Sequence, residues 1–139
     1  MSFAGINYLA VIIAAAASFA FGSIWYMSLA KPWMAALGKS EAEIKGEGGP
    51  SPLPFITAAV AQLVMAFMLA GLIGHLGVGQ VTPVNGLISG FFCWLGFVIT
   101  TMAVNHGFQG ASRALTVIDG GHWLGVLAIQ GLIIGLMGV

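Results

Sequence analysis

Apolar residues occur in four long blocks along this chain rather than in short alternating stretches. The blocks cover residues 6–28, 53–76, 83–105 and 117–137, and each is apolar on all sides. A helix needs about 20 residues to cross roughly 30 Å of hydrocarbon, whereas the strands of a membrane barrel are short and alternate in polarity. The pattern predicts an all-α integral membrane protein, with four transmembrane helices in an antiparallel bundle that forms a single domain over residues 1–139.

Polar segments between the blocks predict where the helices begin and end. Thr82 and Pro83 form an N-cap and first-turn pair for the third helix. The first connection, residues 31–52, is the longest and is expected to hold a short interfacial helix. Within it, Ser40 and Glu43 have the spacing of a capping box, which predicts a further short helix.

Composition indicates that water is not the main solvent of this chain. Charged residues make up 6% of it, hydrophobic residues 59%, and mean hydropathy is +1.02. A soluble domain has about a quarter of its residues charged. The net charge is zero and no basic tail is present, so nothing predicts a nucleic-acid partner. Cys93 is the only cysteine, which excludes an intrachain disulfide.

The few cations predict an orientation in the membrane. Lys31, Lys39 and Lys45 lie in the first connection and Arg113 lies in the third. The positive-inside rule therefore places these connections in the cytoplasm and both termini outside. Four aromatic side chains are expected at the same cytoplasmic interface: Trp25, Tyr26, Trp33 and Trp123.

Small residues recur at four-residue spacing in three of the blocks and predict close contacts between helix backbones. These residues are Ala10, Ala14, Ser18 and Gly22 in the first block, Gly86 and Gly90 in the third, and Gly121, Gly125, Gly131 and Gly135 in the fourth. The stripes either pack within one bundle, or one of them, with the fourth helix as first candidate, faces another subunit. We therefore expect a homo-oligomer or a complex with other membrane protein subunits, surrounded by membrane lipids.

A candidate polar cluster lies where the third and fourth blocks meet. Asp119 is the only acid near a block, His122 follows at i+3, and the short third connection brings His106 back to a similar depth. Two imidazoles and a carboxylate suit zinc or iron, or could relay protons, with Arg113 as the neighbouring cation. Thr116 and Asp119 also fit a capping box, which would place Asp119 in the first helical turn without any ligand. We favour the cap, and assign no metal, cofactor or catalytic residue.

Other polar residues lie within the blocks. They are Gln62, Ser89, Thr100 and Gln130. If they faced one another they could line a polar path, but hydrogen bonds between helices are the favoured interpretation because no charge accompanies them.

Several stretches together carry a family resemblance. They are Asn7–Val11, Gly22–Tyr26, Lys31–Met34 with Leu37 and Gly38, Gly90–Phe97, and Asp119–His122. With them the chain resembles, over nearly its whole length, a family of small bacterial membrane proteins known as domain of unknown function 1761. The resemblance implies a four-helix protein of a bacterial membrane, and it supplies no activity, substrate or catalytic residue.

Three functions remain open from the sequence. The first is a non-enzymatic packing, assembly or accessory subunit of the bacterial inner membrane. The second is an oligomeric channel or transporter for protons or a small solute, with Asp119 and His106 at its cytoplasmic mouth. The third is an interfacial metal-binding protein or enzyme with His122 or His106 as base, although no motif for a nucleotide, a zinc protease or an activated nucleophile occurs.

Overall fold

Helices form the protein, as the apolar blocks predict. The computed structural model describes residues 3–139. In chain order its elements are α1 (Tyr8–Ser28), α2 (Ala30–Leu37), α3 (Glu41–Lys45), α4 (Leu53–Gly74), α5 (Pro83–Cys93), the π-helical turn η1 (Trp94–Val98), α6 (Ile99–Gln109) and α7 (Arg113–Met137). Four segments are long and apolar enough to cross a membrane: α1, α4, the continuous α5–η1–α6 segment, and α7. The protein is therefore a multi-pass membrane protein.

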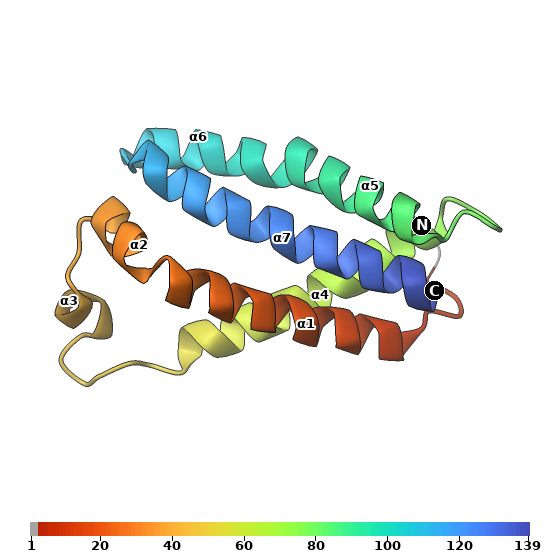
Figure 1. Cartoon of the computed structure of the whole chain (residues 1–139), viewed down its shortest axis with the longest axis horizontal. Helices are drawn as coiled ribbons and strands as arrows, with labels where there is room; N and C mark the ends of the chain where they lie inside the picture. The colour runs from red at the N-terminus through yellow and green to blue at the C-terminus, as the bar shows by residue number, and fades with distance from the viewer. Residues whose placement is uncertain (1–2) are drawn as a thin grey trace.

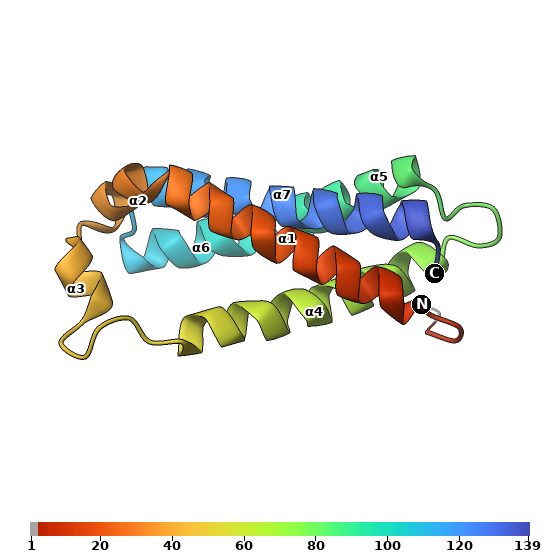
Figure 2. The same ribbon diagram turned by 60° about the horizontal axis from the view of Figure 1, so that its bottom comes forward.

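The four segments form an antiparallel bundle (Figure 1). Both termini and the connection between α4 and α5 lie at one end, called the terminal end below. The turn between α6 and α7 lies at the opposite end with α2 and α3, and this is called the loop end. α1 and α4 approach each other toward the terminal end and separate toward the loop end (Figure 2).

Local capping signals in the sequence fix several helix ends. Thr82 Oγ1 accepts a hydrogen bond from Asn85 N at 3.1 Å, so the predicted start of the third span is confirmed. Ser40 Oγ accepts from Glu43 N at 3.2 Å and starts α3. The interfacial segment thus contains two short helices. In the second, Lys45 Nζ lies 2.6 Å from Glu41 Oε1, and this hydrogen-bonded cation lowers the pKa of the Glu41 carboxyl.

The fourth helix begins earlier than the sequence predicts. Gly110 ends α6 in the left-handed conformation (φ 69°), and Ser112 Oγ then accepts from Leu115 N at 3.2 Å. Helix α7 therefore starts at Arg113, and Asp119 lies in its second turn. The prediction that Thr116 and Asp119 cap this helix is wrong, because Ser112 already supplies the cap one turn upstream.

A buried hydrogen-bonded trio joins α1, α4 and α7. Ser18 Oγ donates to Gln62 Oε1 at 2.8 Å. Gln130 Nε2 donates to Ser18 Oγ and to the Gln62 carbonyl, both at 3.0 Å. The predicted bonds between helices are confirmed for Gln62 and Gln130, whereas Thr100 Oγ1 bonds the Gly96 carbonyl of its own segment.

Glycines of α5 and α7 bring these two backbones into direct contact. A Cβ on Gly86 would collide with the Gly131 carbonyl, and one on Gly131 would collide with the Gly86 carbonyl. A Cβ on Gly90 would lie 2.5 Å from the Leu127 carbonyl oxygen, and Gly135 meets the Thr82 carbonyl. The small-residue stripes of the third and fourth spans therefore pack against each other.

The remaining predicted small residues also face the interior of this chain. Ala10, Ala14 and Ser18 are buried in α1. Gly121 contacts the ring of Trp25, and Gly125 contacts the ring of Phe21. The hypothesis that the α7 stripe faces another subunit is therefore wrong, because α1 and α5 already cover it.

Candidate functional site

Aromatic rings surround the buried imidazole of His122 near the loop end of the bundle. The centroid of the His122 ring lies 4.6 Å from that of Trp123, 4.9 Å from Tyr26 and 6.3 Å from Phe21. A Cβ on Gly22 would lie 2.6 Å from His122 Nε2, so only glycine leaves room for the ring there. Nδ1 of His122 is buried and has no hydrogen-bond partner within residues 3–139.

Three side chains tie neighbouring segments to the second turn of α7. The Tyr26 hydroxyl donates to Asp119 Oδ1 at 2.7 Å. Trp25 Nε1 donates to the Ile118 carbonyl at 3.1 Å, and Trp94 Nε1 donates to the Gly120 carbonyl at 2.8 Å. Asp119 thus serves as the acceptor in a link between α1 and α7.

The predicted cluster of His106, Asp119 and His122 does not converge on one point. His106 Nδ1 lies 2.7 Å from Thr116 Oγ1, Asp119 bonds Tyr26, and His122 packs among aromatic rings. Within residues 3–139, no group of three or more His, Cys, Asp or Glu side chains is arranged to hold a metal ion. Arg113 is exposed in the first turn of α7 and takes no part in an ion pair within residues 3–139. The one ion pair of these residues joins Lys45 and Glu41.

The four predicted interface aromatics are each half-buried rather than fully exposed. The ring centroids of Tyr26 and Trp33 lie 5.7 Å apart in an edge-on contact. Tyr26 and Trp123 both contact His122, and Trp25 bonds the α7 backbone. These side chains therefore pack α1 and α2 onto α7 besides lying at one end of the bundle.

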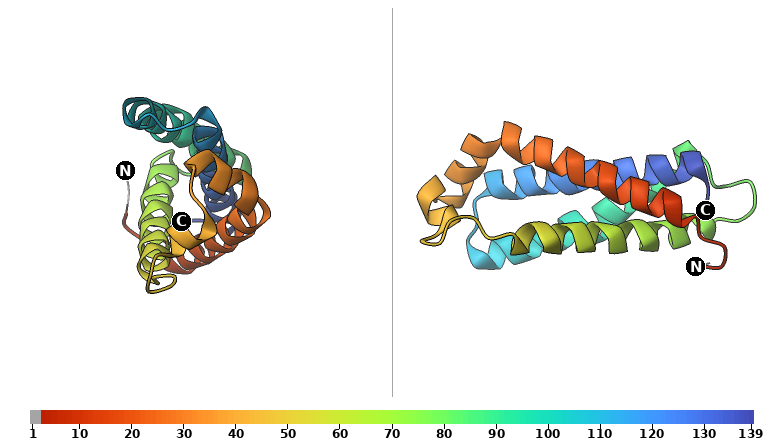
Figure 3. Two further views of the ribbon diagram at one scale, coloured as in Figure 1. Left: turned by 90° about the vertical axis from the view of Figure 1, so that its left-hand side faces the viewer. Right: turned by 90° about the horizontal axis from the view of Figure 1, so that it is seen from below.

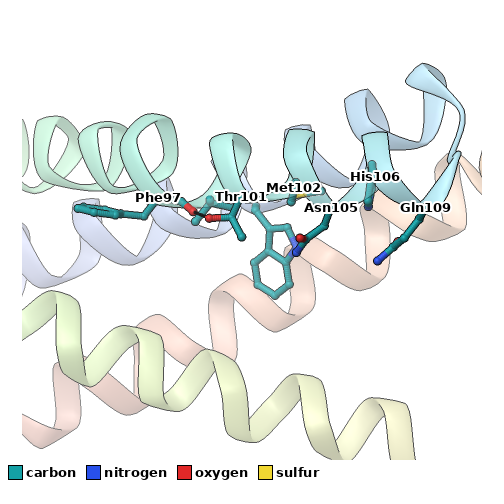
Figure 4. Close-up of a pocket in the computed structure, with 8 residues that line it drawn as sticks. Phe97, Thr101, Met102, Asn105, His106 and Gln109 are labelled. Carbon is teal, nitrogen blue, oxygen red and sulfur yellow. Dashed lines mark hydrogen bonds between the residues drawn. The ribbon is translucent and has the colours of Figure 1, made fainter.

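A groove of about 330 Å³ opens beside α6 and reaches Trp123 of α7 (Figure 4). We call it the α6–α7 groove. Its polar lining comes from Thr101, Asn105, His106 and Gln109. Its apolar lining comes from Phe97, Val98, Met102 and Trp123. The π-helical turn η1 supplies the first two of these apolar residues, and such turns in α-helices frequently occur at functional sites.

The opposite side of the same segment carries an uncovered stripe of small residues. Gly96, Thr100, Ala103 and Gly107 follow one another at spacings of four, three and four residues, and all four are exposed. A Cβ added at Gly96 or Gly107 would meet nothing within 4 Å. We call this the α6 stripe, although its first residue, Gly96, lies in the preceding turn η1. Sequence reasoning missed it, although the same spacing rule that found the other stripes would have found it.

Segment α6 itself is sparsely covered by the rest of the chain. Seen end-on, it lies apart from α1 and α4, with α7 as its neighbour (Figure 3). Only 6% of the apolar window of the α5–η1–α6 segment is buried, against 33–44% in the other three spans. Both sides of α6, the groove and the stripe, are therefore open to the membrane.

The comparisons with known proteins identify a family, but they assign no activity to it. The model of the family described as "Protein of unknown function (DUF1761)" matches residues 9–135, a range that takes in nearly all of the four spans. No curated protein and no solved structure matches the chain.

Proposed function

Since the chain belongs to this family of proteins of unknown function, as the resemblance of its sequence predicted, we propose its function from its geometry. It is a non-enzymatic subunit of a membrane assembly, and the α6 stripe is the surface through which it binds another transmembrane helix. It lies in the bacterial inner membrane, with the loop end in the cytoplasm because Lys31, Lys39, Lys45 and Arg113 belong to that end.

The uncovered glycines carry this proposal. Transmembrane helices associate where small residues let their backbones approach closely, because lipid gives apolar side chains no drive to leave it. Backbone atoms of this chain already occupy the space beside four glycines: Gly86, Gly90, Gly131 and Gly135. Gly96 and Gly107 have the same small-residue context and no neighbour. Their stripe has the form of a helix contact that lacks its second helix.

The occupant we propose is α6 of a second copy of the chain. Soluble oligomers are mostly closed and symmetric, and a two-fold axis brings the same patch of both subunits together. The α6 stripe meets this requirement because it carries no charge, so two identical stripes do not repel each other.

A double substitution tests this proposal. Gly96→Leu with Gly107→Leu fills the stripe without a clash inside the chain, since nothing lies within 4 Å of either Cβ position. Overpacking a close contact costs about 1–3 kcal/mol, so dimerisation should weaken about tenfold or more. Energy transfer between donor- and acceptor-labelled copies in liposomes measures the association.

Ala59→Leu is the matched control, because it enlarges an exposed small residue on α4 instead. It should leave energy transfer at the wild-type level. Wild-type protein that stays monomeric would contradict the proposal of a second copy. Capture of a different membrane protein through an intact stripe would show that the partner is another subunit and not a second copy.

A channel or transporter has less support. The polar trio of Ser18, Gln62 and Gln130 is buried and bonded within itself, so it links three helices instead of lining a path. The groove opens beside α6, and none of the three residues of the polar trio lines it.

A further inference from the structure

The α6–α7 groove has a polar and an apolar part, as an amphipathic ligand requires. Thr101, Asn105 and Gln109 recur every four residues and lie along one side of α6 (Figure 4). At 3.6 residues per turn, this side is opposite to the α6 stripe. The groove is thus separate from the surface proposed above for assembly, and it carries a function of its own.

Hydrogen-bonding groups in the groove are available to a ligand. Neither the Asn105 nor the Gln109 side-chain amide makes a hydrogen bond within the described chain, so each offers both donors and an acceptor. His106 uses Nδ1 with Thr116, which holds the imidazole in place. Its Nε2 remains as a third polar atom of the groove, and the tautomer of the imidazole decides whether this atom donates or accepts a hydrogen bond.

The groove lies where the hydrocarbon meets the head groups. The helical segment begins at Pro83, and Asn105 lies about 33 Å further along the helix axis. The hydrocarbon core of a membrane is roughly 30 Å thick. Residues Asn105 to Gln109 therefore reach the head-group layer, and Phe97 to Met102 lie among acyl chains. A lipid in the adjacent leaflet presents its head group and its first methylenes at these same two depths.

The lining selects the kind of head group. All eight lining side chains lack a formal charge when His106 is neutral, so an anionic head group would find no cation in the groove. Sites for phosphate normally offer Arg or Lys. The volume of about 330 Å³ lies at the small end of the range for ligand pockets, roughly 300–1,000 Å³, and admits one head group of the size of a sugar. Trp123 adds an aromatic face for the apolar side of such a ring.

We infer that the α6–α7 groove binds a membrane lipid with an uncharged, hydroxyl-bearing head group, of the glycosyl diacylglycerol class. Asn105, Gln109 and His106 Nε2 bond the hydroxyls, and Phe97, Met102 and Trp123 contact the apolar parts.

Native mass spectrometry of the full chain tests this inference. The protein is released from detergent in the presence of monoglucosyl diacylglycerol, phosphatidylglycerol or phosphatidylcholine with identical acyl chains. Wild-type protein should retain the glucosyl lipid about thirtyfold better than either phospholipid, because its hydroxyls bond Asn105 and Gln109 and two hydrogen bonds of typical strength give a factor of that order. The double variant Asn105→Leu with Gln109→Leu should lose this preference.

Thr57→Val is the control, because it removes a polar side chain from α4 at the loop end outside the groove. It should keep the wild-type preference. Equal retention of the three lipids by the wild type, better retention of a phospholipid, or an unchanged preference in the double variant would each overturn the inference. All of these readouts are independent of dimerisation through the α6 stripe.

Discussion

Single polar side chains in this protein act mainly by forming hydrogen bonds that link one helix to another. Asp119 is the only acid within a span, and it receives a hydrogen bond from the hydroxyl of Tyr26. The indoles of Trp25 and Trp94 bond backbone carbonyls on either side of it. An ionisable group in a membrane segment calls for a functional hypothesis. Here the structure gives it a structural partner on another helix.

Tyr26→Phe tests this role of Asp119. The change removes one hydroxyl and leaves the carboxyl without its partner, which costs about 1–3 kcal/mol. The free energy of unfolding in detergent, measured by denaturant titration, should fall by that amount. Tyr8→Phe removes a hydroxyl from an exposed tyrosine of the same helix and should have no effect. Equal stability of both variants would show that the link between Tyr26 and Asp119 contributes nothing.

Sequence alone could not place the individual polar contacts. It named His106, Asp119 and His122, but it could not tell that Thr116 would bond His106 or that Tyr26 would bond Asp119. Those contacts depend on the start of α7, where Ser112 and Thr116 are both good N-caps one turn apart. With α7 starting at Arg113, Thr116 lies inside the helix, where its hydroxyl meets His106 instead of capping a helix end.

At the scale of the elements, the sequence gives the helices and their small-residue stripes but not the partner of each stripe. The four spans follow from the apolar blocks, because a backbone in lipid has to bond within its own segment. The glycines of α5 and α7 follow the same small-residue spacing as those of the α6 stripe, and only the fold shows which of them a neighbouring backbone covers. The α6 stripe is therefore recognised as an open contact surface only when its glycines are compared with the covered glycines of α5 and α7.

Two alanine substitutions in the third span separate these kinds of glycine. Gly86→Ala forces a Cβ into the backbone of α7, which should lower the free energy of unfolding by about 1–3 kcal/mol. Gly96→Ala meets nothing within 4 Å and replaces a poor helix former, so stability should stay equal or rise by up to about 1 kcal/mol. Denaturant titration of monomeric protein in detergent compares them. Equal losses at both positions would contradict the contact between α5 and α7.

At the scale of the whole molecule, one packed core of α1, α4 and α7 supports a more open segment, α5–η1–α6. The core holds the buried alanines and the polar trio, and α7 holds the open segment through its glycines. The open segment has one side suited to a second helix and one suited to a lipid. Both proposals depend on four complete crossings of the bilayer, with the loop end on one side and the terminal end on the other.

Site-specific labelling tests these crossings most directly. In a Cys93→Ser background, Lys39→Cys places a single thiol at the loop end and Gln80→Cys places one at the terminal end. Intact right-side-out vesicles are treated with a membrane-impermeant maleimide before and after permeabilisation. Gln80→Cys should react at once and Lys39→Cys only after permeabilisation. Reaction of both thiols from the same side would contradict the four-span arrangement.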